Sequence, residues 1–269
     1  MAKAGENEGA RTIGRVLKVL ELFAETQKPL RLVDVSKALD VPASSAHVLL
    51  QQLVRYNYIQ SLEDRRYAQS SGLVVLASQV LSGVELIKVA RPLLERLSVD
   101  TGESIYLGAR TPQGIVYVDS KEATYGLVSR VPLGSLRPLH ASSAGRVFLS
   151  FAVPPESLDA FLGPNPLVAY TSHTPIDKAE LRRLMKRTRA DGCAINEQAM
   201  IDKVYGVSAP IFDAHGTLSG TLTLSAPDTR FIPQREALIQ AVKAAASDIS
   251  RASGLIDWNR TVASFSEIT

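Results

Sequence analysis

A run of small residues between Leu139 and Gly145 could bind an anion. Leu139-His-Ala-Ser-Ser-Ala-Gly145 leads into a predicted helix, and small side chains leave the backbone N–H groups of a helix N-terminus open to a carboxylate. Ser142 and Ser143 add hydroxyl donors, and Ala144 lies between them and the glycine. The same run is also typical of a tightly packed helix cap with no ligand, and the residues alone leave both interpretations open.

The same serines could instead serve as nucleophiles of a hydrolase, because they follow His140 at a predicted turn into a helix. The Gly-x-Ser-x-Gly pattern is absent, and a histidine two or three residues from a serine is poorly placed as its base. The sequence also lacks His-Glu-x-x-His and a phosphate-binding Gly-x-x-x-x-Gly-Lys. We therefore expect no enzyme, no cofactor and no metal.

A second group of polar residues, near the N-terminus, has the chemistry needed to read DNA. Ser44, Ser45, His47 and Gln51 lie opposite a predicted leucine stripe, where they could reach phosphates and base edges, and glutamine can bind adenine through two hydrogen bonds. Four arginines could contact the DNA backbone or the minor groove, two before or on the first helix and two at a hairpin tip: Arg11, Arg15, Arg65 and Arg66.

Three helices and a hairpin would position these residues. Apolar residues at helical spacing predict a helix from Thr12, with Ile13, Leu17 and Phe23 on one face, and a second over 32–39. A third begins at Ser44 or Ser45, which could cap it, and buries Ala46, Leu49, Leu50 and Leu53. Short strands over 58–61 and 67–69 complete the outline of a winged helix-turn-helix, although a small helical bundle with solvated polar faces would share much of this pattern.

Beyond residue 70 the predicted elements are mixed. Residues 71–89 predict an apolar helix that packs against another chain, and Pro92 is expected to start a further helix. Strands are predicted over 103–110, 115–119, 125–131, 194–196, 204–212 and 218–225, with helices over 142–151, 178–189 and 233–252. The fold class is therefore α+β with an antiparallel-rich sheet. The predicted organisation is a disordered lead-in (1–10), a DNA-binding domain (11–70), a connecting helix (71–90), a second domain (91–254) and a tail (255–269).

Composition fits this organisation. At about 150 residues a domain, 269 residues suggest two domains, and 45% hydrophobic residues are enough for ordinary cores. One cysteine excludes a disulfide framework, and no apolar run approaches the roughly 20 residues of a membrane span. Residues 1–9 lack the apolar core of a signal peptide, so we expect a cytoplasmic protein. A net charge of +3 permits a nucleic-acid partner without requiring one.

The ordered motifs resemble the IclR family of bacterial transcriptional regulators. The resemblance is carried by residues 15–23 (RVLKVLELF), 32–50 (LVDVSKALDVPASSAHVLL), Tyr67, 138–146 (PLHASSAGR), Asp191-Gly192 with Asn196-Glu197, 206–213 (GVSAPIFD) and 224–227 (LSAP). It extends from about Thr12 to Ala252. The chain departs at Val48, where the family commonly has an arginine, so the operators of relatives should not be transferred to it.

The resemblance implies a GAF-like effector domain whose ligands are often small carboxylic acids. It adds five residues to the small-residue loop as pocket lining: Ser129, Asn196, Gly206, Thr223 and Ser225. Since one recognition helix covers only a few base pairs, we expect a homodimer on a near-palindromic double-stranded DNA operator. The resemblance implies that such a dimer is often doubled into a tetramer, and it leaves repression and activation open. A DNA-binding protein that responds to no ligand is the remaining alternative.

Overall fold

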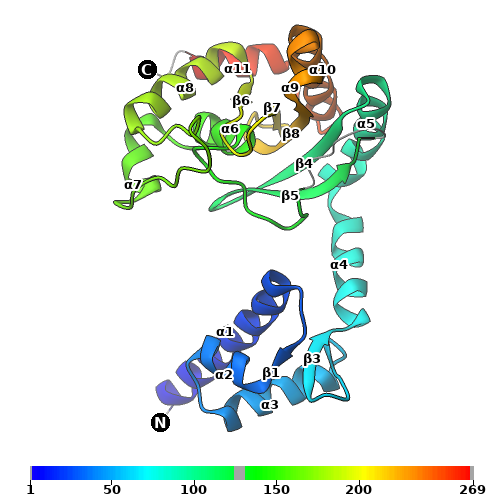
Figure 1. The fold of residues 1–269 in the computed structure, drawn as a ribbon, viewed down its shortest axis with the longest axis vertical. Coiled ribbons are helices and arrows are strands. Elements are labelled where there is room, and N and C mark those ends of the chain that lie inside the picture. The colour runs from blue at the N-terminus through cyan, green and yellow to red at the C-terminus, as the bar shows by residue number, and fades with distance from the viewer. Residues whose placement is uncertain (1, 124–130, 267–269) are drawn as a thin grey trace. The chain divides into compact units, whose positions relative to one another are not determined.

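The computed structural model describes residues 2–123 and 131–266, which form two compact units, Met1–Gly83 and Val84–Thr269 (Figure 1). Each unit has its own hydrophobic core. The division falls within the predicted connecting segment 71–90, which therefore contributes to both units. No helix of the described residues is long and apolar enough to cross a membrane.

The N-terminal unit is a winged helix-turn-helix, as predicted. Its elements are α1 (Ala2–Thr26), β1 (Leu30–Arg31), α2 (Leu32–Leu39), α3 (Ala43–Arg55), β2 (Ile59–Ser61), β3 (Arg66–Gln69) and α4 (Ser71–Gly83). The strands form a small antiparallel sheet in the order β1-β3-β2. Its core joins α1, α2, α3 and the wing through Phe23, Val35, Leu50 and Ile59. The core fixes α3 on one side only, and this leaves its other side to solvent.

The first helix differs from its prediction in where it begins and in which face it buries. It begins at Ala2, so residues 2–10 are helical rather than a disordered lead-in; alanine and glutamate, which recur there, are good helix formers, despite two glycines in the segment. The predicted buried face is also partly wrong, because Ile13 and Leu17 are exposed, whereas Val19 and Phe23 are buried. The buried face is centred on Val16, Val19 and Phe23, and Leu17 lies to one side of it around the helix.

The C-terminal unit is a five-stranded antiparallel sheet covered by helices. The strands run β5-β4-β8-β7-β6, with β4 (Ser104–Thr111), β5 (Gly114–Lys121), β6 (Ala194–Glu197), β7 (Val204–Phe212) and β8 (Leu218–Pro227). Helices α5 (Glu85–Thr101) and α10 (Arg235–Ala252) pack against each other and the sheet, and α6 (Ser143–Ala152) packs against β7, β8 and α8 (Lys178–Asp191). Short elements complete the unit: η1 (Pro155–Ser157), α7 (Leu158–Leu162), α9 (Asp228–Phe231), η2 (Ile232–Gln234) and α11 (Trp258–Ser266).

The helical segment that connects the units is interrupted at Val84, between α4 and α5, and not at Pro92 as predicted. Pro92 lies inside α5, although a proline within a helix costs about 3 kcal/mol. Ile87 and Leu94 of α5 are buried, and each such side chain contributes about 1.5–3 kcal/mol, so the continuous apolar face outweighs the proline. Val84 and Ile87 thus pack within the C-terminal unit and do not extend the apolar stripe of α4.

The predicted tail is also structured. Trp258 and Val262 of α11 are buried, and the Trp258 indole N–H donates to the Pro210 carbonyl at 2.9 Å. Packing against α8 therefore orders the C-terminal segment. The predicted strand over 125–131 falls almost wholly outside the described residues.

Candidate functional site

Helix α3 presents two chemically different faces. Ala46, Leu49, Leu50 and Leu53 are buried in the unit, while Ser44, His47 and Gln51 are exposed and Ser45 is half-buried. Val48, which stands where the IclR family commonly has an arginine, is 59% exposed beside them. The exposed face therefore offers hydroxyl, imidazole and amide groups around one apolar side chain, which suits base edges and a thymine methyl group.

The start of α3 differs in one detail from its prediction. Its N-cap is Pro42, whose side chain accepts no hydrogen bond, and the helix begins at Ala43. Ser44 and Ser45 thus lie in the first turn instead of capping it. The preceding turn is held by Asp40 in the left-handed region (φ 51°) and by the Ser36 hydroxyl, which donates to the Val41 carbonyl at 2.7 Å. This turn sets the direction in which α3 leaves α2.

The two arginines of the wing are not equivalent. Arg66 pairs with Asp64 at 2.5 Å, and this hydrogen-bonded ion pair lowers the pKa of the Asp64 carboxyl. Arg65 occupies the left-handed position of the hairpin turn (φ 61°) and is exposed, with no side-chain partner among residues 2–123 and 131–266. Arg11 and Arg15 are exposed on α1. Arg65 is therefore the wing cation available to a phosphate.

In the C-terminal unit, the loop before α6 is locked onto the first turn of the helix. Ser142 is the N-cap: its oxygen accepts from the Gly145 N–H at 2.9 Å, and its hydroxyl donates to the Pro138 carbonyl at 2.7 Å. A Cβ on Gly145 would lie 2.4 Å from the Pro138 oxygen, so only glycine permits this approach. The small-residue run is thus a helix cap that is held tightly against the residues before it.

A cavity of about 40 Å³ lies at the start of α6. Six of the predicted pocket residues line it: Ser142, Ser143, Asn196, Gly206, Thr223 and Ser225. Ala144 does not, because its side chain is fully buried in the hydrophobic core, and Ser129 lies outside the described residues. Segments that are distant in sequence therefore meet at one cavity.

A chain of hydroxyl groups leads to Ser143. The Ser208 hydroxyl donates to Ser143 Oγ at 2.8 Å, and Ser208 and Thr223 oxygens are 2.7 Å apart. Since Ser208 has one proton and gives it to Ser143, Thr223 must donate to Ser208. Ser143 then retains its own proton, which can be donated to a ligand. Ser208 was not among the predicted residues, and only its position on β7 beside Ser143 identifies it.

Arg137 is a candidate ligand-binding residue of this cavity that the sequence analysis did not identify. It lines the cavity, its guanidinium carbon lies 5.1 Å from the centre of the Tyr117 ring, and its buried Nε has no hydrogen-bond partner among the described residues. Tyr106 and Tyr117 stack at 4.9 Å between ring centres. Burial raises the pKa of both phenols, and this effect outweighs the opposing influence of the Arg137 charge. Arg137 lies two residues before the small-residue run, and this position is the only sequence signal that could have indicated it.

The polarity of the cavity favours an anionic ligand over hydrolysis. Among its described lining residues Arg137 is the one charged group, and neither a histidine nor a carboxylate is present. His140 Nε2 is instead 2.8 Å from the Val168 carbonyl oxygen, and Ser142 donates to Pro138. The described residues hold no group of side chains that could bind a metal ion. The serines thus have no base within reach here, whereas a carboxylate would meet a cation and a hydroxyl donor.

The structure agrees with known relatives in sequence and fold. Residues 12–69 match the family model "IclR helix-turn-helix domain", and residues 78–251 match "Bacterial transcriptional regulator IclR C-terminal". The acetate operon repressor of Salmonella typhimurium is 26% identical over 248 residues, which cover 91% of this chain and 90% of the repressor. The transcriptional regulator XynR of Escherichia coli is 27% identical over 221 residues, or 82% of this chain and 87% of XynR.

Solved structures give the same result. An IclR transcriptional regulator from Alicyclobacillus acidocaldarius superimposes with a TM-score of 0.81 at 21% identity, covering 90% of this chain and 98% of that one. An IclR homologue from Microbacterium hydrocarbonoxydans, solved in complex with 4-hydroxybenzoate, has a TM-score of 0.79 at 22% identity, with coverage of 90% and 98%. The chain belongs to the IclR family of bacterial transcriptional regulators.

Proposed function

We propose that this regulator is a cytoplasmic homodimer whose affinity for a near-palindromic operator is changed by a small organic acid. The N-terminal unit would bind double-stranded DNA with the exposed face of α3 in the major groove and Arg65 on the backbone. One recognition helix contacts only a few base pairs, so useful specificity needs two of them on one body. Four exposed apolar residues of α4 could pair two chains: Val74, Val75, Leu76 and Val80.

We call the cavity at the start of α6 the effector cavity, after the role that we propose for it. The observation that carries the proposed ligand class is its lone charge, Arg137. A carboxylate placed there would pair with Arg137, accept from the Ser143 hydroxyl and lie near the N-terminus of α6. The stacked Tyr106 and Tyr117 rings offer an apolar surface for the rest of the molecule. The 4-hydroxybenzoate complex of the Microbacterium hydrocarbonoxydans homologue supports an acid of this general kind.

The proposal is tested by the effect of Arg137 on acid binding. The full chain is screened by thermal shift against aliphatic and aromatic carboxylic acids, and the acid that stabilises it most is titrated by calorimetry. A hydrogen bond to a charged group contributes about 1.5–3 kcal/mol, so Arg137→Gln should weaken that acid by at least about tenfold. Arg260→Gln, which changes an exposed arginine outside the cavity, should leave it unchanged. Equal affinities of wild type and Arg137→Gln would remove the basis for the proposed site.

A further inference from the structure

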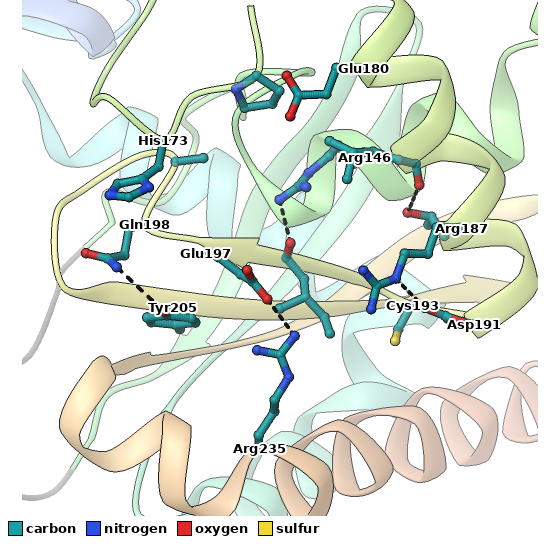
Figure 2. Close-up of a pocket in the computed structure, with 15 residues that line it drawn as sticks. Arg146, His173, Glu180, Arg187, Asp191, Cys193, Glu197, Gln198, Tyr205 and Arg235 are labelled. Atoms are coloured by element: carbon teal, nitrogen blue, oxygen red, sulfur yellow. Dashed lines mark hydrogen bonds and ion pairs between the residues drawn. The ribbon is translucent and has the colours of Figure 1, made fainter.

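A second and larger pocket lies beside the edge strand β6. Its volume is about 360 Å³. Its lining comes from α8 and the loop before it, from β6 and the residues next to it, and from single side chains of α6, β7 and α10 (Figure 2). Successive residues of β6 line different pockets: Ile195 and Glu197 line this one, whereas Asn196 lines the effector cavity. Because side chains alternate along a strand, the two pockets lie on opposite sides of β6.

Arg146 of α6 brings a buried positive charge into this second pocket. Its side chain lines the pocket, and the residue is only 4% exposed. Its Nη2 donates to the Ile195 carbonyl at 2.7 Å, as the dashed line in Figure 2 shows. Its buried Nε has no hydrogen-bond partner, and no carboxylate lies within 4.0 Å to form a salt bridge with it among residues 2–123 and 131–266.

The other arginines of the pocket already have partners. Arg187 pairs with Asp191 at 3.2 Å, and Arg235 pairs with Glu197 at 2.5 Å. Glu180 is the remaining acid of the lining, and its side chain is exposed. Burial lowers the pKa of Arg146 to about 10, against the opposing influence of Glu197 and Glu180, so the guanidinium keeps its charge at neutral pH. A buried charge without a counterion is costly, and a bound anion would remove much of that cost.

We propose that this pocket is a second ligand site, which binds a small oxyanion, a carboxylate or a phosphate, through Arg146. The planar guanidinium donates from Nη2 to Ile195 and keeps further N–H groups for a ligand. Such a site differs from the effector cavity in its cation, because Arg137 belongs to one pocket and Arg146 to the other, and Tyr205 is the one residue that lines both. The proposal does not depend on the DNA-binding role of the protein.

The test measures binding of sodium phosphate and of sodium acetate to the full chain by calorimetry and thermal shift, at constant ionic strength set with sodium chloride. Wild type should bind at least one of the two saturably, and which one responds distinguishes a phosphate site from a carboxylate site. Arg146→Met replaces the cation with an apolar side chain of similar length and should lower the affinity by at least about tenfold. Arg183→Gln, an exposed arginine of α8 outside the pocket, should bind as wild type does.

A second variant keeps Arg146 and so does not depend on the folding of Arg146→Met. Glu180→Gln removes a negative charge from the lining and should increase the affinity for the anion. The proposal is overturned if neither anion binds saturably, if Arg146→Met folds and binds as wild type does, if Glu180→Gln leaves the affinity unchanged, or if Arg137→Gln alone abolishes binding.

Discussion

At the scale of single residues, the two arginines of the wing show how a neighbour decides what a charge can do. Asp64 holds Arg66 in a hydrogen-bonded ion pair, whereas Arg65 is exposed and carries its charge to the tip of the hairpin. Their positions in the sequence differ by one residue, and their types are identical. The pattern predicted two equal DNA contacts, but the structure makes Arg65 the stronger candidate.

Arg65→Ala should therefore weaken DNA binding more than Arg66→Ala. Removing one phosphate contact reduces the salt dependence of the affinity by about one in the log–log slope. We expect that change for Arg65→Ala, with similar decreases in affinity across different DNA sequences, and a smaller change for Arg66→Ala. Fluorescence anisotropy at several salt concentrations measures both. The assignment is wrong if Arg66→Ala alters the slope as much as Arg65→Ala does.

Residue types predicted part of the effector cavity and missed its charge. Ser142 and Ser143 could be found because small residues before a helix form a recognisable pattern. Arg137 has no such pattern, since its role comes from the stacked Tyr117 and from burial, both of which require the fold. The prediction that Ala144 lines the cavity is wrong because it considered position in the sequence alone: Ala144 lies in the small-residue run, but the helix directs its side chain into the core.

At the scale of elements, α3 is the one whose two faces the sequence defined best. Its leucine stripe is buried as predicted, because burial of one face at helical spacing is the main signal that a sequence carries. The ends of elements were less predictable. The helical residues 2–10, the break at Val84 and the helix α11 depend on packing or on local backbone preferences that no periodic pattern shows.

Gln51→Ala tests the placement of α3. A glutamine that binds one adenine through two hydrogen bonds discriminates against other bases by about 1–3 kcal/mol. We expect the variant to lose base preference at a single operator position, as measured by selection from a random DNA pool followed by sequencing. Gln60→Ala changes an exposed glutamine of β2 and should keep the wild-type profile. An unchanged profile for Gln51→Ala would mean that another surface reads the bases.

At the scale of the whole molecule, the exposed apolar residues of α4 form the interface that we propose between two copies of the chain. Val74, Val75, Leu76 and Val80 are each more than 40% exposed on one helix, and a group of large exposed apolar side chains on one element is a candidate interface. A second copy of the chain is the partner that two half-sites of a palindrome would need. In this account DNA binding, assembly and ligand binding belong to separate parts of the chain, namely α3, α4 and the sheet unit.

The assembly role of α4 is tested by the double variant Val75→Asp/Val80→Asp. Two carboxylates in an apolar interface must be desolvated without partners. We therefore expect the double variant to be a monomer at micromolar concentration, and we expect wild type to be a dimer or a larger assembly there. Sedimentation velocity measures the difference. Val99→Asp changes a valine that is 81% exposed on α5 and serves as the matched control. A double variant that sediments as wild type does would place the interface elsewhere.

The central claim is that a ligand in the effector cavity changes the affinity of the protein for DNA. The direct measurement is the affinity of the full chain for its selected operator, with and without the acid that binds it most tightly. The account predicts a change of about 5- to 150-fold for wild type, and none for Ser143→Leu, whose side chain would fill the cavity while α3 stays unchanged. The claim is contradicted if Ser143→Leu responds as wild type does, or if the acid binds wild type with no effect on its affinity for the operator.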